Sequence, residues 1–357
     1  MSVLGTLYRG ETGYDFVGRR RTFFVISGVL IAISIISLAT RKLDGSVDFT
    51  GGTIVEAPNE AGVTIGEVRS ALSAIGEGGA RVQLVGDNDD LILVQTRALS
   101  VQHQDELVSA VAAIAGASVD DTNVDAVGPT FGAEITRRAV EALVIFLGVV
   151  ALFITWRFEW KMAMAAMAAL FHDLLITAGF YSVVGFEVTP STVIAVLTIL
   201  GYSLYDTVVV FDKIIENARE LANKQTYGEI ANLSMNQVLM RSINTSLTTL
   251  LPIGSLLFVG SYALGADTLR EFALALFVGV AAGTYSSIFI ATPLLTLWKE
   301  REPQWRRMER RAERRVPELL EQAAVASPAR QDVAVEPRSP AASGAVPRPP
   351  RQRKKRR

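Results

Sequence analysis

The sequence contains no cysteine and only two histidines, His103 and His172, among its 357 residues. Without cysteine the chain forms no disulfide bond, thiolate metal site or cysteine nucleophile, and two histidines exclude a histidine-rich metal centre. Charged residues are also scarce, at 20%, whereas 50% of the residues are hydrophobic and the mean hydropathy is +0.31. A soluble protein of this length would need unusually large cores to bury so much apolar surface. The composition therefore indicates a membrane protein.

Apolar stretches of about twenty residues, the length that crosses a bilayer, recur along the chain. They occupy roughly residues 22–40, 139–156, 162–184, 190–211, 243–260 and 272–298. The first begins directly after Arg19, Arg20 and Arg21. Its length, and the five stretches that follow, favour a retained signal anchor over a cleaved signal peptide. The sequence predicts a polytopic α-helical membrane protein with six transmembrane helices.

The charges are strongly segregated. Residues 44–136 hold 15 acidic and 3 basic residues, a net charge of −12, whereas residues 299–357 hold 17 basic and 8 acidic residues, a net charge of +9. Lys and Arg also flank the short connections between stretches two and three and between four and five, which marks the cytoplasmic side. The tryptophans lie at the same ends, where their amphipathic rings favour the membrane interface; they are Trp156, Trp160, Trp298 and Trp305.

These patterns divide the chain into five parts. We predict a cytoplasmic segment at 1–21, a first helix at 22–40, an extracytoplasmic domain at 41–138, helices two to six at 139–298 with a cytoplasmic loop at 212–242, and a basic cytoplasmic tail at 299–357. Both termini are then cytoplasmic. The end of the tail, rich in Pro, Ala and Arg, is expected to be disordered. It is either a solvated topology anchor or a segment that touches anionic lipid or ribosomal RNA.

The extracytoplasmic segment has the pattern of an α+β domain. Apolar and polar residues alternate at Val47–Phe49, which leads into a predicted strand at 53–55. Further strands are predicted at 81–85, 91–96 and 118–127. Helical patterns occur at 64–75 and 102–115. The resulting order, βαββαβ, is that of ferredoxin-like domains.

Asp173 lies in the middle of the third apolar stretch, where a charged side chain costs about 2.5–3.5 kcal/mol on insertion scales. Ala169 and Thr177, four residues before and after it, make this helix face small and polar, which suits packing against another helix. His172 precedes it, and histidine is the side chain that titrates near neutral pH. We expect Asp173 either to belong to a proton pathway or to be a structural carboxylate that accepts a hydrogen bond from another helix.

Asp206 lies in the fourth apolar stretch. Tyr202 and Ser203, four and three residues before it, place hydroxyls and the carboxylate on one helix face, and Thr207 follows directly. A hydrated or proton-conducting interior requires such a face. We therefore predict that Asp206 couples to protons with Tyr202, Ser203 and Thr207 in support, the alternative being a structural carboxylate.

Arg241 begins the fifth apolar stretch. Thr245, Thr248 and Thr249 follow at intervals of about one turn, so a stripe of hydroxyls runs down one helix face from the guanidinium. We expect Arg241 to form a salt bridge with Asp206 that opens when the acid is protonated. Alternatively, the long arginine side chain only reaches the cytoplasmic interface.

Five motifs together resemble the SecF branch of the SecD/SecF family of protein-export membrane proteins, which belongs to the RND-like superfamily. In chain order they are Asp48–Thr53, Val127–Gly132, Phe171–Asp173, Gly201–Asp212 and Arg241–Ser246. Two residues depart from the family pattern: Tyr205 stands where Asn is common, and Lys213 where Arg is common. Tyr205 is still able to donate a hydrogen bond.

The resemblance implies an RND-like bundle for which SecD supplies a matching half, in an accessory complex on the SecY channel of a bacterial inner membrane. In that family the proton-motive force completes export of unfolded polypeptides. The essential membrane carboxylate would be Asp206, the essential arginine Arg241, and Asp173 a further motif acid. The expected partners are SecD, the SecY channel complex, the translocating polypeptide and the bilayer, with no cofactor, no enzymatic activity and no specific nucleic acid.

Two other functions remain open from the residues. An RND-type, proton-coupled half-transporter for lipids or small molecules would use the same buried acids, although one small outer domain argues against it. An intramembrane aspartyl protease would use acids on adjacent helices, but the Gly-x-Gly-Asp pattern of such enzymes is missing from the sequence.

Overall fold

The computed structural model describes residues 13–86, 89–221, 224–263, 267–308 and 310. Most of the predicted cytoplasmic tail lies outside the described residues. Within the described ranges the chain is mainly helical, with a small antiparallel sheet inserted after the first long helix.

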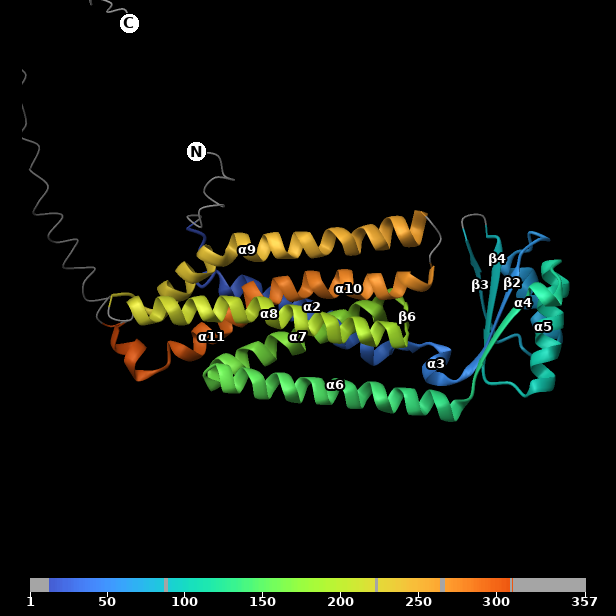
Figure 1. Cartoon of the computed structure of the whole chain (residues 1–357), viewed down its shortest axis with the longest axis horizontal. Coiled ribbons are helices and arrows are strands. Elements are labelled where there is room, and N and C mark those ends of the chain that lie inside the picture. Colours follow the sequence, from blue (N-terminus) through green and yellow to red (C-terminus); the bar gives the residue numbers. More distant parts are fainter. Residues whose placement is uncertain (1–12, 87–88, 222–223, 264–266, 309, 311–357) are drawn as a thin grey trace, which may run out of the picture. The chain divides into compact units, whose positions relative to one another are not determined.

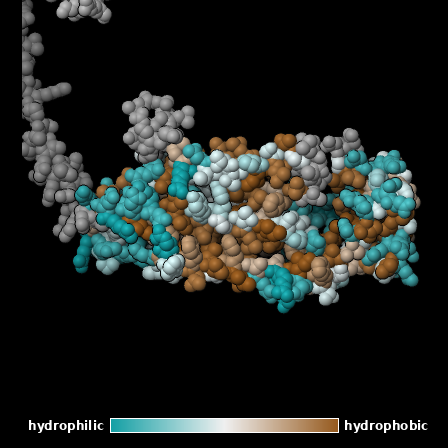
Figure 2. All heavy atoms as spheres, viewed as in Figure 1, coloured by the Kyte–Doolittle hydropathy of each residue, from teal (hydrophilic) through white to brown (hydrophobic). Residues whose placement is uncertain are grey.

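Six helices in the described part are long and apolar enough to cross a membrane, which confirms the predicted number. They are α2 (Arg20–Thr40), α6 (Pro129–Arg157), α7 (Trp160–Val184), α8 (Pro190–Leu221), α9 (Tyr227–Ser255) continued by the π-helical segment η2 (Leu256–Ala263), and α10 (Asp267–Ser286) continued by the π-helical segment η3 (Ser287–Ala291) and α11 (Thr292–Lys299). Helices α7, α8 and α10 pack against one another, with α2 on α7 and α9 on α8 (Figure 1). Figure 2 shows that hydrophobic side chains cover the middle of this bundle, and hydrophilic ones gather towards its ends.

Two helix boundaries extend beyond the predicted membrane stretches. Helix α6 begins at Pro129, ten residues before the predicted start of the second span, because proline is favoured in the first turn of a helix. The predicted cytoplasmic loop 212–242 is almost entirely helical, since α8 continues to Leu221 and α9 begins at Tyr227. Thr226 and Glu229 form a capping box at the start of α9.

The inserted domain has the predicted βαββαβ order. Its elements are β2 (Gly52–Pro58), α4 (Ile65–Ala74), β3 (Arg81–Val85), β4 (Leu91–Thr96), α5 (Val101–Ala115) and β5 (Asn123–Val127). The strands form one antiparallel sheet in the order β3-β4-β2-β5. Helices α4 and α5 cover one face of it (Figure 1), and alternate strand residues such as Val55 and Ile92 are buried against Leu72 and Leu107 of these helices.

Two segments that we expected to be extended are not, although the strand predicted at 53–55 is longer than expected, as β2. Residues Val47–Phe49 do not form a strand but lie in a short helix, α3 (Val47–Thr50), which ends at Gly51 with a left-handed φ of 73°. Residues 119–121 form a 3₁₀ turn, η1 (Val119–Asp121), because the Ser118 side chain accepts a hydrogen bond from the backbone N–H of Asp120. The turn at η1 replaces the beginning of the strand that we predicted at 118–127.

A short β pairing connects two segments of the chain next to the inserted domain. Strand β1 (Asp44–Gly45), after α2, pairs in parallel with β6 (Glu187–Val188), between α7 and α8. Nη1 of Arg81 in β3 lies 2.6 Å from a carboxylate oxygen of Asp44 and 2.7 Å from one of Glu187. One guanidinium therefore connects the edge of the sheet to both strands of this pair.

A second connection is made by glycines in two of the resembling motifs. A Cβ on Gly51 would lie 2.8 Å from Cα of Pro129, and a Cβ on Gly132 would lie 2.7 Å from the carbonyl oxygen of Phe49. No side chain fits at such distances. The first turn of α6 is therefore held tightly against α3 and the start of β2.

Ion pairs connect the helices at the end of the bundle that lies opposite the inserted domain. Lys299 is 5% exposed and bonds Glu159 and Glu302. Trp305 is 7% exposed and packs edge-on against the ring of Tyr227, with 5.0 Å between centroids. The Trp305 ring thus helps to close this end of the bundle.

Candidate functional site

Polar side chains are buried between the membrane helices, far from the ends where solvent is available. They belong to α7, α8, α9, α10 and η3, and comprise His172, Asp173, Ser203, Asp206, Thr207, Ser242, Ser246, Ser286 and Ser287. Buried polar groups at this depth must find partners within the protein. The partners that they find divide the set into two clusters, one around Asp173 and one around Asp206.

Two glycines of α10 allow these helices to approach closely. A Cβ on Gly279 would lie 2.3 Å from Cδ1 of Ile199, and a Cβ on Gly283 would lie 2.8 Å from Cβ of Ser203. Small residues at this spacing permit close packing of membrane helices. The contact brings the hydroxyls of Ser286 and Ser287 to the level of the two acids.

Asp173 is 1% exposed and fully bonded. Its Oδ2 accepts hydrogen bonds from the hydroxyls of Ser203, at 2.6 Å, and Ser286, at 2.8 Å. Its Oδ1 lies 3.1 Å from Nδ1 of His172. Three helices thus meet at one carboxyl group, which gives Asp173 the interhelical hydroxyl contacts that a structural carboxylate requires.

His172 extends the first cluster to a fourth helix. Its Nε2 lies 3.1 Å from the hydroxyl of Ser27 in α2, which in turn lies 3.5 Å from the hydroxyl of Tyr285. Either ring nitrogen carries the proton according to the tautomer. A continuous chain of exchangeable protons therefore runs from α2 through His172 to Asp173.

Asp206 is 5% exposed and only half bonded. Its Oδ1 accepts a hydrogen bond of 2.8 Å from the hydroxyl of Ser242 in α9. Its Oδ2 is buried and has no hydrogen-bond partner among the described residues. A carboxyl oxygen without a partner at membrane depth is costly, which separates Asp206 from the fully bonded Asp173.

Arg241 does not form the salt bridge with Asp206 that we expected. Its Nη2 donates instead to the hydroxyl of Tyr205, at 2.9 Å, and its guanidinium lies 5.9 Å from the centre of that ring. Two neighbouring residues of α8 are thus matched to two neighbouring residues of α9. Tyr205 bonds Arg241, and Asp206 bonds Ser242. The hydrogen bond to Tyr205 thus holds the Arg241 guanidinium near Asp206, but Arg241 and Asp206 do not form an ion pair.

The supporting residues predicted on α8 do not bond Asp206. The hydroxyl of Ser203 goes to Asp173, and that of Thr207 lies 2.9 Å from the hydroxyl of Ser287. The hydroxyl of Tyr202 is buried and has no hydrogen-bond partner among the described residues. Spacing along one helix therefore gave the correct face, but not the correct partners.

The threonines of the predicted hydroxyl stripe on α9 bond within their own helix. Thr245, Thr248 and Thr249 each donate to a carbonyl of the preceding turn of their own helix. Ser242 and Ser246 face the neighbouring helices instead, and the hydroxyl of Ser246 lies 2.8 Å from that of Thr284. The sequence did contain a signal for these contacts, because Ser242 directly follows Arg241 and Ser246 follows one turn later. The prediction did not use these two serines.

The last span changes from α- to π-helix at Ser287, beside both clusters. The Ser287 hydroxyl donates 3.1 Å to the backbone carbonyl of Ser203. π-Helical turns widen the backbone spacing and occur frequently at functional sites. Among the described residues, no group of three or more His, Cys, Asp or Glu side chains is arranged to hold a metal ion.

Comparison with known proteins identifies the family. Residues 99–301 match the family described as "Protein export membrane protein SecD/SecF, C-terminal". The chain is 44% identical to the protein translocase subunit SecF of Streptomyces coelicolor over 87% of this chain and 84% of that protein. It is 42% identical to the protein translocase subunit SecF of Mycobacterium tuberculosis, over 88% of this chain and 73% of that protein.

A solved structure agrees with the fold. The crystal structure of SecDF from Thermus thermophilus, described as a translocon-associated membrane protein, superimposes with a TM-score of 0.72 at 38% sequence identity. The match covers 81% of this chain and 39% of the SecDF chain, so this protein spans well under half of that longer polypeptide. With an RND-like bundle and six apolar helices in the part of the chain that the structure describes, this multi-pass protein of a bacterial inner membrane belongs to the SecF family of protein translocase subunits.

Proposed function

We propose that this chain is the SecF subunit of the Sec translocase accessory complex, in which it acts with SecD to complete the export of unfolded polypeptides through the SecY channel. The proton-motive force is the energy source, and Asp206 is the group that couples to it. The observation that carries this assignment is the half-bonded state of buried Asp206 beside an arginine that bonds elsewhere.

The proposed cycle alternates between two arrangements of the same residues. When Asp206 holds a proton, Arg241 rests on Tyr205, which is the arrangement in this structure. When the proton leaves, the carboxylate at membrane depth needs a cation, and Arg241 moves from Tyr205 to Asp206. Because α8 and α9 pack through these side chains, the exchange shifts the two helices against each other.

The available energy is sufficient for such a step. One elementary charge that crosses the membrane potential yields about 2.3 kcal/mol per 100 mV. A population shift from 1:99 to 99:1 requires roughly 5.5 kcal/mol. At 100 mV, about two to three protons per cycle therefore supply the energy for a full shift between the two arrangements.

The inserted domain is the proposed output. Helix α6 is held against α3 by Gly132, and Arg81 connects β3 to the loop between α7 and α8. A shift of α6, α7 or α8 would thus reach the sheet through these two contacts. With both termini in the cytoplasm, as the Lys and Arg of the connections favour, the acidic domain would meet the emerging polypeptide outside.

The test is late-stage export into membrane vesicles that carry this protein with SecD. Under an imposed proton gradient, we expect Asp206→Asn to lose the gradient-dependent part of export while it still copurifies with SecD. The matched control is Asp212→Asn on the same helix, because Asp212 is 44% exposed and pairs with Arg157 near the end of the bundle. Wild-type response to the gradient in Asp206→Asn would refute the coupling role.

Copurification separates this function from the half-transporter. A SecF subunit should be retained with the SecY channel, whereas a transporter should retain a lipid or small ligand instead. Retention of neither SecD nor SecY by the wild-type protein would contradict the proposed assembly.

A further inference from the structure

A buried histidine and a buried acid lie side by side in α7, and the proposed cycle uses neither of them. Nδ1 of His172 is 3.1 Å from Oδ1 of Asp173, and the two side chains are 5% and 0% exposed. Among the residues that the structure describes, His172 is the one basic side chain within ion-pair distance of Asp173. The number of protons that this pair holds therefore decides whether the middle of the bundle carries a net charge here.

A chain of hydrogen bonds from α10 and α2 assigns a hydrogen to the other ring nitrogen. The Phe23 carbonyl can only accept, so the Tyr285 hydroxyl, 3.1 Å away, donates its single hydrogen to it. Tyr285 can then only accept from the hydroxyl of Ser27, which donates its own hydrogen over 3.5 Å. The Ser27 oxygen is left to accept from Nε2 of His172, at 3.1 Å. Nε2 therefore carries a hydrogen.

The other side of the ring requires one further hydrogen. Oδ2 of Asp173 already accepts from Ser203 and Ser286, and Oδ1 faces Nδ1 of His172. Without a hydrogen between them, these two acceptor atoms would repel each other, and the carboxylate would be a net negative charge at membrane depth. With one hydrogen between them the pair is neutral overall, whether the nitrogen or the oxygen carries it.

The side chains of neighbouring helices that bond the pair or stack on it are, in the described part of the chain, all hydroxyl-bearing. They are Ser27 of α2, Ser203 of α8, and Tyr285 and Ser286 of α10. Of these, only the phenol of Tyr285 is titratable, and it donates to the Phe23 carbonyl. The Ser286 hydroxyl also lies 3.2 Å from the carbonyl of Gly283. These hydrogen bonds thus end on backbone carbonyls, which cannot pass a proton on.

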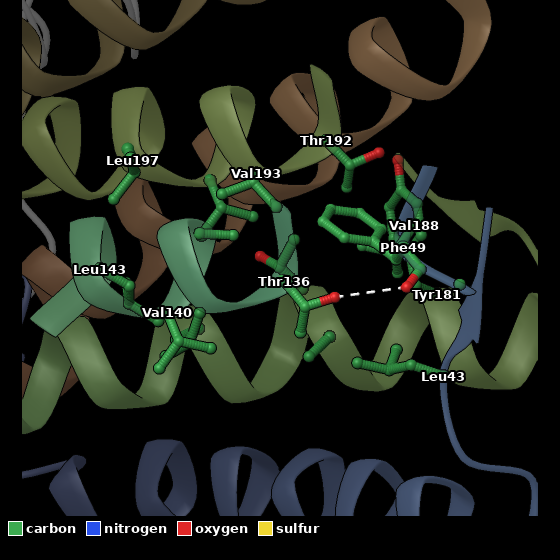
Figure 3. A pocket seen from close by; sticks show the side chains of 16 residues that line it. Leu43, Phe49, Thr136, Val140, Leu143, Tyr181, Val188, Thr192, Val193 and Leu197 are labelled. Carbon is green, nitrogen blue, oxygen red and sulfur yellow. Dashed lines mark hydrogen bonds between the residues drawn. The ribbon is translucent and has the colours of Figure 1, made fainter. Parts of the chain in front are cut away.

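A largely apolar cavity lies beyond the pair, towards the inserted domain. Leu174 and Thr177, one residue and one turn after Asp173, line this cavity of about 400 Å³ between α6, α7 and α8. Figure 3 shows hydrocarbon side chains such as Leu143 and Leu197 around it, and the Thr177 hydroxyl donates to the Asp173 carbonyl of its own helix. Because apolar cavities do not hold chains of water molecules, the cavity does not conduct a proton from the pair to the outer side.

We propose that His172 and Asp173 share one proton between Nδ1 and Oδ1, and that the bundle retains this proton while Asp206 exchanges its own. The pair is thus a second proton site, and its place at the junction of α2, α7, α8 and α10 makes this proton part of the packing of these helices. The shared proton follows from the hydrogen bonds alone, and only the contrast with Asp206 rests on the proposed function.

The test uses the full chain with ¹⁵N-labelled histidine in lipid bilayers, with and without unlabelled SecD. The sequence contains only two histidines, and His103→Gln removes the exposed one, so the remaining nitrogen signals of this variant belong to His172. We expect these signals to show a hydrogen on Nε2 and to be the same at about pH 6 and about pH 8, on either side of the usual histidine titration. In the wild-type chain, the signals of His103 should change between these pH values.

Three results would overturn the proposal. An Nε2 atom without a hydrogen would show that Ser27 donates to the ring. His172 signals that change with pH as those of His103 do would show that the pair loses its proton. Retention is measured by transfer of the wild-type protein into deuterium oxide, where the ring hydrogens of His172 should persist after those of His103 have exchanged. Equal exchange rates would contradict retention.

Two matched variants separate the pair from Asp206. Asp173→Asn replaces the shared proton by an amide hydrogen that does not transfer, so the Nδ1 signal of His172 should shift. Asp206→Asn, the same change on the neighbouring helix, should leave both His172 signals at their wild-type positions. An unshifted Nδ1 signal in Asp173→Asn would overturn the pair, and shifted signals in Asp206→Asn would overturn its independence. If Asp173→Asn does not fold, the spectra of His103→Gln at the two pH values still decide.

These spectra require neither a proton gradient nor an exported polypeptide. A failure of the shared proton is therefore distinguishable from a failure of the proposed export function, which is measured with Asp206→Asn in vesicles.

Discussion

Ser203 in α8 donates its hydroxyl hydrogen to Oδ2 of Asp173 in α7 over a distance of 2.6 Å. Ser286 in α10 reaches the same oxygen at 2.8 Å. This carboxyl group therefore joins the three helices that pack together in the middle of the bundle, whereas Asp206, three residues after Ser203, is bonded from one side only. The two buried acids of α7 and α8 thus have different structural roles.

Asp173→Ala should destabilise the bundle. It leaves the buried Ser203 hydroxyl without its acceptor, at a cost of about 1–3 kcal/mol, and leaves Ser286 only its bond of 3.2 Å to the Gly283 carbonyl. Asp173→Asn keeps one acceptor oxygen and should lose clearly less. The measurement is the melting temperature of the purified protein in detergent, and a larger loss for Asn than for Ala would contradict the structural role.

Tyr205→Phe should weaken proton-driven export several-fold, because Arg241 loses the hydroxyl that holds it away from Asp206. Tyr205→Asn restores a hydrogen-bonding side chain and should retain most of the activity. The measurement is gradient-dependent export in vesicles with SecD.

Tyr202→Phe is the matched control for Tyr205→Phe. The Tyr202 hydroxyl has no partner among the described residues, so its removal should leave export unchanged. A strong defect in Tyr202→Phe, or none in Tyr205→Phe, would argue against the resting position of Arg241.

Gly132→Ala should destabilise the contact between α6 and α3. Its Cβ would lie 2.7 Å from the Phe49 carbonyl oxygen, and such overpacking typically costs about 1–3 kcal/mol. Gly148→Ala on the same helix meets no atom within 4 Å and should be neutral or stabilising by up to about 1 kcal/mol. The measurement is the thermal unfolding of both variants. Equal melting temperatures would contradict the predicted destabilisation by Gly132→Ala.

Glu187 should make stability depend on pH. Burial raises the pKa of its carboxyl group, Arg81 opposes this, and the neighbouring Asp44 and Asp48 raise the pKa further. The folded protein then holds this proton more tightly than the unfolded chain, so the contribution of Glu187 to stability is present at low pH and is lost as pH rises through the folded pKa.

Glu187→Gln does not titrate. Between about pH 4 and about pH 7, around the ordinary glutamate range, its melting temperature relative to wild type should therefore become less negative or more positive as pH rises. Glu60→Gln, at an exposed position, should show a constant difference. A Glu187→Gln difference that falls with rising pH would show that the pair with Arg81 outweighs burial.

The sequence predicts the number of spans because apolar runs of membrane length are unambiguous. It does not predict where α6, α8 and α9 end, because outside the bilayer polar helices follow capping residues such as Thr226 and Glu229 instead of hydropathy. The order of strands and helices in the inserted domain follows from the alternation of apolar and polar residues and from the turn residues. The turn at Gly51, however, requires a left-handed φ that this alternation does not reveal.

The limits are clearest at Asp206. Periodicity places Ser203 and Asp206 on related faces of one helix, yet it contains no information about the register between α8 and α9. A shift of one residue in that register decides whether Arg241 or Ser242 meets the acid, and the structure has Ser242 there. Partners across helices depend on close contacts such as that of Gly283 with Ser203, which only the packed bundle defines.

The continuous helices of the predicted cytoplasmic loop have a mechanical consequence. From Asp206, α8 runs without interruption to Leu221, about 22 Å at 1.5 Å per residue. There Asn217 bonds both Ser234 and Gln237 of α9 at 2.8 Å, so the two helices form one stiff hairpin. A small rotation of α8 at Asp206 therefore produces a larger displacement at the far end of the helix, about 22 Å away. Since the chain has no native cysteine, a single spin label near Lys224 would report proton binding from outside the membrane in real time.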